Sequence, residues 1–136
     1  MSENLPALNE SHLKLFGLVE AVKKNFTLTD PPLEHYFADG VYGRQMVIRQ
    51  GELVVGRIHK QGAINVLLSG QVALYSANNG AAQVYKAPCI FVSSAGKQRA
   101  IFGISEAVMM CVLATDLKDP QEIFDTLTYF PQTQEN

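Results

Sequence analysis

The side chains best suited to chemistry in this 136-residue chain are basic, and they cluster in two short stretches. They are Arg57 and His59 in residues 51–70, and Lys97 and Arg99 in residues 88–103. Guanidinium, ammonium and imidazole groups carry several N–H donors, which suit a phosphate or a carboxylate. If the two stretches meet in one fold, the sequence predicts a basic site for a small anionic ligand.

Side-chain alternation indicates which residues would share the interior of such a fold. Residues two apart on a strand point to the same side, so an inward His59 predicts that Val55 and Arg57 also point inward. The other positions predicted to face inward are Ala63, Asn65 and Leu67 on the next strand, and Arg99 and Ile101 on the last. Asn65 is thereby added to the predicted ligand-binding residues.

Tyr42 and Arg44 are predicted to add a stacking ring and a further guanidinium at the mouth of the site. Alternatively, Tyr42 and Arg44 would form an ordinary cross-strand pair on the surface. The basic groups of the two stretches also have a second interpretation. They would lie at the rim, reach water and pair with surface acids such as Asp39 or Glu106.

Catalysis finds little support in the sequence, and no catalytic residue, cofactor or metal is predicted. Ser93 and Ser94 lack the Gly-x-Ser-x-Gly setting of a nucleophile elbow. No Asp or Glu stands where it would orient His59, and no second carboxylate suits acid and base work.

Short strand-like runs separated by turn residues fill the middle of the chain. They cover residues 41–49, 53–59, 64–68, 71–76, 83–86, 89–93, 99–103 and 106–114. No helical pattern lies between them, which predicts an all-β fold, an antiparallel barrel or jelly roll. The residues before the first run, 35–37, are interpreted as a loop that packs on the barrel end or lids its opening.

One helix is predicted on each side of the barrel. After a flexible arm over residues 1–10, Ser11 caps an amphipathic helix over 11–25. Asp119 and Pro120 begin a short helix that runs to about residue 130, followed by a polar tail over 131–136. A single domain over 11–130, with its barrel at about 35–115, is the expected organisation.

The overall composition excludes several classes of partner. A net charge of −2 gives no broad basic field, so nucleic acid is not expected as a partner. No apolar run reaches the roughly 18 residues of a membrane span, and no leader pattern is present, so we expect a soluble, cytoplasmic protein. Cys89 and Cys111 lie in apolar runs and are predicted to be buried free thiols rather than a disulfide.

The spacing of the two basic stretches resembles the two motifs of the cupins. The first cupin motif reads glycine, five residues, histidine, one, histidine, three or four, glutamate, six, glycine. The second reads glycine, five residues, proline, one, glycine, two, histidine, three, asparagine. The matching positions here are Gly51, Arg57, His59, Ala63 and Gly70, then Pro88, Ser94, Gly96, Arg99 and Gly103.

The resemblance lies in the spacing and the turn glycines, and it does not extend to the metal ligands. Metal cupins use the two histidines and the glutamate of the first motif and the histidine of the second. Three of those positions hold Arg57, Ala63 and Arg99, which supply no metal donor, so a metal-free cupin-like jelly roll is implied.

Residues 35–114 also resemble small cupin-like proteins encoded by tailed bacteriophages, for which the resemblance implies no activity. Three functions stay open. The first is binding of a small anion of the nucleotide or sugar-phosphate class. The second is a structural or interaction module, such as an accessory virion or anti-defence protein with a host or virion partner. The third is a metal-independent isomerase or epimerase that uses His59 and Tyr42.

A homodimer is expected in each case. The positions predicted to face outward on residues 64–68 are apolar, and both alternating sets of residues 106–114 are apolar as well. A sheet that is apolar on both faces needs another layer, either the predicted first helix or a second subunit. Cupins commonly pair in this way.

Overall fold

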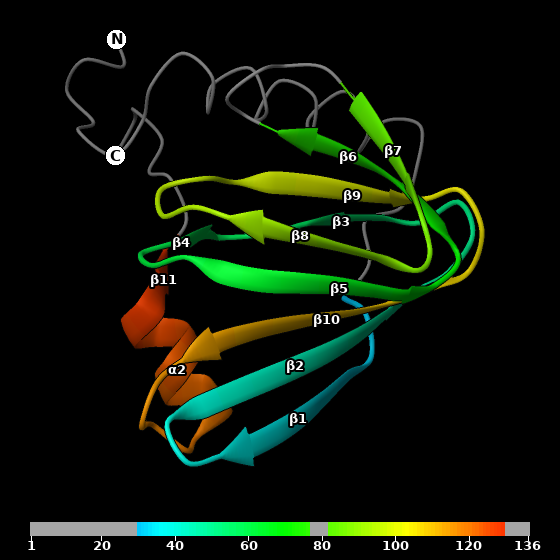
Figure 1. Ribbon diagram of the computed structural model, residues 1–136. Helices are drawn as coiled ribbons and strands as arrows, with labels where there is room; N and C mark the ends of the chain where they lie inside the picture. The colour runs from blue at the N-terminus through cyan, green and yellow to red at the C-terminus, as the bar shows by residue number, and fades with distance from the viewer. Residues whose placement is uncertain (1–29, 77–81, 130–136) are drawn as a thin grey trace, which may run out of the picture.

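Two antiparallel sheets pack against each other and a short helix closes one end of the space between them (Figure 1). The computed structural model describes residues 30–76 and 82–129. The predicted arm, the helix over 11–25 and the polar tail lie outside these described residues. Within the described ranges, no helix is long and apolar enough to cross a membrane.

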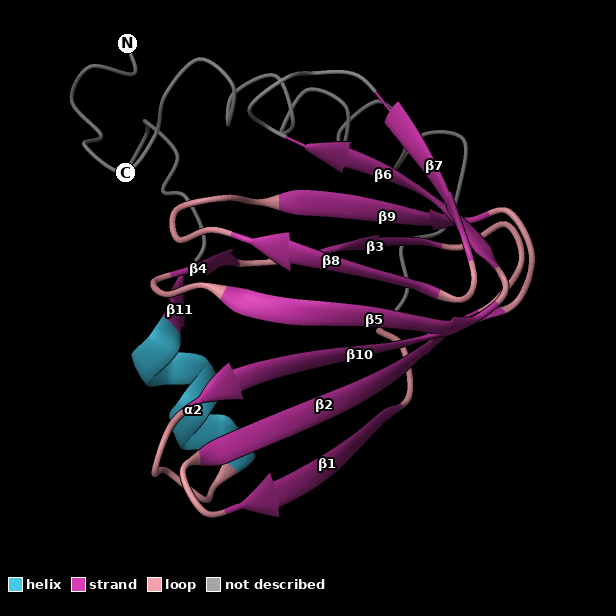
Figure 2. Ribbon diagram, viewed as in Figure 1, coloured by secondary structure: helices cyan, strands magenta, loops and turns pink. Residues whose placement is uncertain are grey.

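The five-stranded sheet has the order β1-β2-β10-β5-β8, and the four-stranded sheet has the order β3-β9-β6-β7 (Figure 2). The first sheet consists of β1 (Leu33–Ala38), β2 (Val41–Ile48), β10 (Ala107–Ala114), β5 (Ala63–Ser69) and β8 (Cys89–Ser93). The second consists of β3 (Leu53–Val55), β9 (Arg99–Gly103), β6 (Gln71–Ser76) and β7 (Ala82–Lys86). A two-stranded ladder joins β4 (Ile58–His59) to β11 (Thr128–Tyr129). The predicted antiparallel jelly roll is confirmed.

The main core lies between the sheets because alternate residues of their strands are apolar and point inward. From the five-stranded sheet it includes Met46, Ile48, Leu67 and Met109; from the other it includes Val54, Val72, Leu74 and Ile101. The same alternation points residues of the candidate site toward the space between the sheets.

Residues 33–38 form β1, so the interpretation of residues 35–37 as a loop is wrong. This strand pairs with β2 through a tight turn in which Gly40 has φ +72°, a value that L side chains rarely adopt. The strand lies at the sheet edge and all six residues are exposed. It therefore lacks the alternation of buried and exposed residues by which strands are recognised.

The run predicted over 53–59 is two strands, because β3 ends at Val55 and β4 begins at Ile58. The break changes the phase of the alternation. Val54 joins the main core, whereas Val55 packs with Leu53 and Ala100 in a separate cluster. Val55 lines the cavity as predicted, but it packs outside the main core, because alternation holds only along an uninterrupted strand.

Helix α2 (Pro120–Leu127) begins where predicted. The Asp119 carboxylate caps it by accepting from the Glu122 backbone N–H at 2.9 Å. The helix ends three residues before the predicted limit at residue 130, because Thr128 is extended and pairs with His59 in the β4–β11 ladder. The end of α2 is thus tied directly to the strand that carries the histidine.

Candidate functional site

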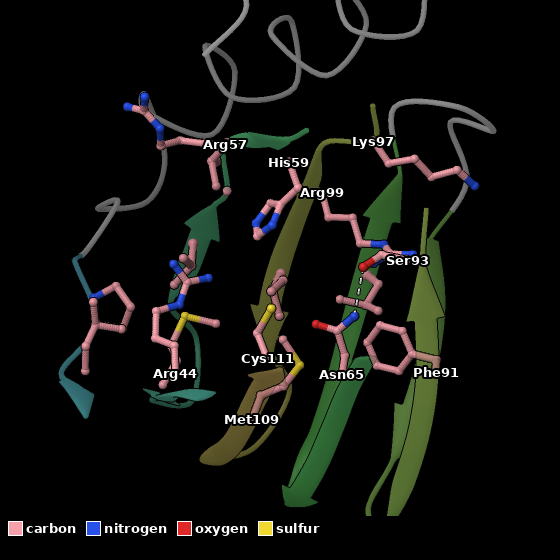
Figure 3. Close-up of a pocket in the computed structure, with 18 of the residues that line it drawn as sticks. Arg44, Arg57, His59, Asn65, Phe91, Ser93, Lys97, Arg99, Met109 and Cys111 are labelled. Carbon is pink, nitrogen blue, oxygen red and sulfur yellow. Dashed lines mark hydrogen bonds between the residues drawn. The ribbon is translucent and has the colours of Figure 1, made fainter. Parts of the chain in front are cut away.

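A cavity of about 430 Å³ opens between the two sheets (Figure 3). Its polar and charged wall consists of Asp30, Arg44, Arg57, His59, Asn65, Ser93, Ser94, Lys97 and Arg99. Its apolar and thiol-bearing wall includes Leu33, Met46, Val54, Leu74, Phe91, Ile101, Met109, Cys111 and Phe124. This volume is within the range of small-molecule sites, roughly 300 to 1,000 Å³.

One row of neighbouring residues crosses the five-stranded sheet and forms one wall of the cavity. Arg44 is the register partner of Cys111, Cys111 of Asn65, and Asn65 of Phe91. Because register partners lie side by side on one face, the strand pairing fixes their order. The Asn65 side-chain amide donates to Ser93 Oγ at 3.0 Å, which orients the amide at the cavity wall.

Arg99 reaches the same cavity from β9 of the other sheet. Its guanidinium carbon lies 5.2 Å from the centre of the Phe91 ring, within the range of a cation–π contact. Burial lowers the pKa of Arg99, which means that its charge is poorly solvated. Arg99 does not pair with Asp39 or Glu106, because the described residues form one ion pair, between Arg49 and Glu52.

Arg44 lacks a partner for part of its guanidinium. Its Nε is buried and has no hydrogen-bond partner among the described residues. A buried donor without an acceptor costs about 1 to 3 kcal/mol. The acid among the described residues of the cavity wall is Asp30, which lies exposed in the chain segment before β1. The guanidiniums of Arg44 and Arg99 thus face one cavity, and no ion pair among the described residues includes either.

His59 joins the two basic stretches. Its backbone carbonyl accepts from the Gly96 N–H at 2.8 Å, so the turn after β8 is held against β4. Burial, followed by the charges of Arg44 and Arg99, lowers the pKa of His59 from 6.5 to about 4. The imidazole is therefore neutral at pH 7 and offers one donor and one acceptor.

Arg57 lines the cavity, but its guanidinium is engaged elsewhere. Arg57 Nε donates to Thr128 Oγ1 at 2.7 Å, and the guanidinium carbon lies 4.2 Å from the centre of the Phe124 ring. Figure 3 shows this side chain directed away from His59 and Arg99, and it shows Lys97 extending outward as well. Both residues are at the cavity wall, while Arg44 and Arg99 are the cations directed into it.

Tyr42 does not line the cavity. It is buried one row away from Arg44, in a cluster with Ala63, Leu113 and Ile123. Its hydroxyl lies 2.6 Å from His35 Nδ1 on β1. The predicted role of Tyr42 at the mouth is thus not supported, and neither is the surface pair, because alternation specifies the face of a strand and not the level along it.

Sequence reasoning missed the residues that complete the cavity wall. Phe91, Met109 and Cys111 were not predicted to line the cavity, although all three lie two residues from another inward position. Both alternating sets of β10 are apolar, so the sequence carried no signal for which set faces inward. Cys89 and Cys111 are free thiols as predicted, but only Cys111 is buried, and burial raises its pKa; Cys89 is partly exposed.

The cavity does not fit a divalent metal. Within residues 30–76 and 82–129, no three His, Cys, Asp or Glu side chains gather where they could hold one. A guanidinium has no lone pair for a metal and repels a cation. A buried thiol with a raised pKa also resists the deprotonation that metal binding requires.

Among the comparisons with known proteins, the one with solved structures bears on the fold. Neither a protein-family model nor a curated protein sequence matches the chain. Among solved structures, an uncharacterized conserved protein with a double-stranded β-helix domain from Klebsiella pneumoniae is similar at a TM-score of 0.56 and 16% identity, covering 70% of this chain and 87% of that one. A cupin superfamily protein from Desulfitobacterium hafniense is similar at a TM-score of 0.55 and 15% identity, covering 66% of this chain and 82% of that one.

A third similar structure is the Cupin_2 domain of an XRE family transcriptional regulator from Enterobacter cloacae, with a TM-score of 0.55 and 12% identity. The match covers 64% of this chain and 98% of that domain. Identities this low support a shared fold and leave the chemistry to be argued from the site itself. The chain has the double-stranded β-helix fold of the cupin superfamily, with a basic cavity between its sheets.

Proposed function

We propose that this cupin-fold protein binds a small anionic molecule, of the nucleotide or sugar-phosphate class, in the cavity between its sheets. The observation that carries the proposal is the pair of guanidiniums, Arg44 and Arg99, that approach one cavity from opposite sheets. Each lines the cavity, and no ion pair among the described residues includes either. An anion between the two side chains would lessen the repulsion between the two cations.

His59 and Asn65 would complete the binding group. A neutral imidazole and a side-chain amide each provide donors that suit the oxygens of a phosphate or a carboxylate. Lys97 is a secondary contact in this proposal, because it stands at the wall and extends outward (Figure 3). Arg57 acts by positioning, since it links β4 to the end of α2 through Thr128.

The test is ligand-dependent stabilisation of the chelator-treated protein by inorganic phosphate, AMP and glucose 6-phosphate. A ligand that binds the folded state raises its melting temperature. Arg44→Gln and Arg99→Gln should each weaken binding by about 10- to 100-fold, the usual effect of removing hydrogen bonds from a charged group. Arg49→Gln is the matched control, because Arg49 pairs with Glu52 outside the cavity.

The free variants distinguish binding from a structural role. If the arginines serve a ligand, Arg44→Gln without ligand should be as stable as the parent or more stable, because the substitution removes one of two like charges that face the cavity and breaks no ion pair among the described residues. Marked loss of stability in both variants, with no anion raising the melting temperature of the parent, would contradict the proposal.

A second candidate function, an interaction module, is favoured by a different observation. The outer face of the five-stranded sheet exposes Ile90 at 71% and Val92 at 72% of their surface on β8, and Ile64 at 48% on the adjoining β5. Exposed apolar side chains on adjoining strands mark surfaces that other proteins cover. The resemblance to phage-encoded proteins would make that partner a host or virion protein. The isomerase alternative loses its basis, because Tyr42 and His59 do not share the cavity.

A further inference from the structure

The cavity wall divides into two levels along the strands. We name Arg44, His59, Asn65 and Arg99 the polar belt, and Met46, Val54, Leu74, Ile101 and Met109 the apolar floor. All five floor residues are buried members of the main core. The floor is therefore the part of the hydrophobic core that is open to the cavity.

Strand register places the belt and the floor at successive levels. On the five-stranded sheet, Arg44 pairs with Cys111, and the next inward pair toward the core is Met46 with Met109. On the other sheet, Arg99 is followed inward by Ile101, which pairs with both Val54 and Leu74. The guanidiniums of Arg44 and Arg99 thus share one level, and the level adjoining it carries apolar side chains from both sheets.

This arrangement constrains the part of a ligand that does not carry charge. Sugar hydroxyls placed against methionine, leucine and isoleucine side chains would lose their hydrogen bonds to water without replacement. An apolar group in the same place would remove both itself and the floor from water. Met46 and Met109 are unbranched and can adapt to groups of different shape.

We propose that the preferred ligand is an amphipathic anion, a carboxylate or phosphate monoester whose charged group binds the polar belt and whose apolar body rests on the floor. This inference rests on the anion binding proposed above and names the ligand class within it. Of the two classes considered there, sugar phosphates fit the floor poorly, and a nucleotide fits only if its base occupies it.

The test is isothermal titration of the full chain with acetate, butyrate, hexanoate and octanoate, and with hexyl phosphate, glucose 6-phosphate and inorganic phosphate. Affinity should rise about fourfold for each methylene until the floor is filled, which is the effect of burying one methylene. Hexyl phosphate beside hexanoate shows which charged group is preferred. Hexanol, which lacks the charge, should bind at least about 10-fold more weakly than hexanoate.

Two methionines that are adjacent in sequence provide a matched pair of variants. Met109 is buried on the floor, whereas Met110 is the next residue of β10 and points to the other face. Met109→Gln should flatten the dependence of affinity on chain length. Met110→Gln should preserve the dependence. The titration series on the parent protein stands on its own if Met109→Gln does not fold.

The possible failures are distinguishable. If inorganic phosphate binds and Arg99→Gln abolishes its binding, while chain length has no effect or glucose 6-phosphate binds more tightly than hexyl phosphate, the amphipathic class is wrong and the anion site stands. If no anion in the series binds, both proposals fall. If hexanol binds as tightly as hexanoate, the floor binds apolar groups without help from the belt, and the class is again wrong.

Discussion

At the scale of single residues, the site is defined by two partly buried guanidiniums, those of Arg44 and Arg99, that form no ion pair among the described residues. Arg44 and Arg99 both lower the pKa of His59, after the larger effect of burial. A neutral histidine between two guanidiniums is the arrangement expected of a cavity that holds an anion, because adding a third positive charge there would be costly. The protonation of His59 is therefore a measure of the electrostatics of the whole site.

The depressed pKa of His59 makes stability depend on pH in a defined window. In the unfolded chain the histidine binds a proton as pH falls through 6.5, whereas in the folded protein it does so only near 4. The unfolded state therefore binds more protons between these values, and stability falls as pH falls through the window, by at most about 3 kcal/mol. Below pH 4 this contribution should not change further.

The measurement is the free energy of unfolding by urea from pH 8 to pH 3.5 for the parent and for His59→Gln. Other titrating groups contribute to both proteins, so the difference between the two curves isolates the histidine. We expect the difference to change between about pH 6.5 and 4 and to be flat outside that range. Parallel curves throughout would show that the site does not hold His59 neutral.

At the scale of elements, uninterrupted strands were predictable and the break in one strand was not. Alternation correctly placed Asn65 and Leu67 inward on β5, and Arg99 and Ile101 inward on β9. It did not show the break between β3 and β4, where residues 56–57 leave the strand and Val54 lines the cavity as well as Val55. Such a break depends on contacts made across the fold, including the bond from the Gly56 N–H to the Arg99 carbonyl, and a local pattern does not record them.

The level at which a residue lies along its strand also could not be predicted from the sequence. Tyr42 and Arg44 lie on the same face of β2, yet only Arg44 lines the described cavity. The difference comes from the pairing with β10 and from α2, which covers the row that contains Tyr42. The fold was thus predictable from turns and spacing, whereas the membership of the site required the register.

Helix α2 is fastened to the barrel through Thr128, and this junction is testable. Thr128 is buried; its Oγ1 accepts from Arg57 and donates to the Phe124 carbonyl. Thr128→Val keeps the shape but leaves the Arg57 Nε and the carbonyl without that partner. We expect a loss of about 1 to 3 kcal/mol in the free energy of unfolding measured in urea.

Thr126→Val is the control for this substitution, because Thr126 is exposed on the same helix and should change stability by less than about 0.5 kcal/mol. If the two variants are equally stable, the contact between Arg57 and Thr128 does not hold the helix in place. If Thr128→Val also abolishes anion binding, the position of β4 depends on this junction, which agrees with the pairing of Thr128 and His59.

At the scale of the whole molecule, the five-stranded sheet has two apolar faces. Its inner face is the core, and its outer face carries apolar residues in neighbouring register positions on three strands. They are Ile90 and Val92 on β8, Ile64 and Val66 on β5, and Met110 and Val112 on β10. The strand β8 is also the edge of the sheet, where unpaired backbone groups favour association.

We propose that a second copy of the chain covers this outer face, because a self-complementary two-fold contact is the commonest way in which one sheet buries another of its kind.

Val92→Lys should weaken the dimer by at least about a hundredfold, since the two-fold places the charge in the contact twice. Val92 is 72% exposed, so the fold of the monomer should be retained. Val84→Lys, at an exposed position on β7 of the other sheet, should leave the dimer intact. Sedimentation analysis of the parent and both variants tests the proposal, and a monomeric parent would contradict it, leaving the apolar face to the predicted helix over residues 11–25 or to a different partner protein.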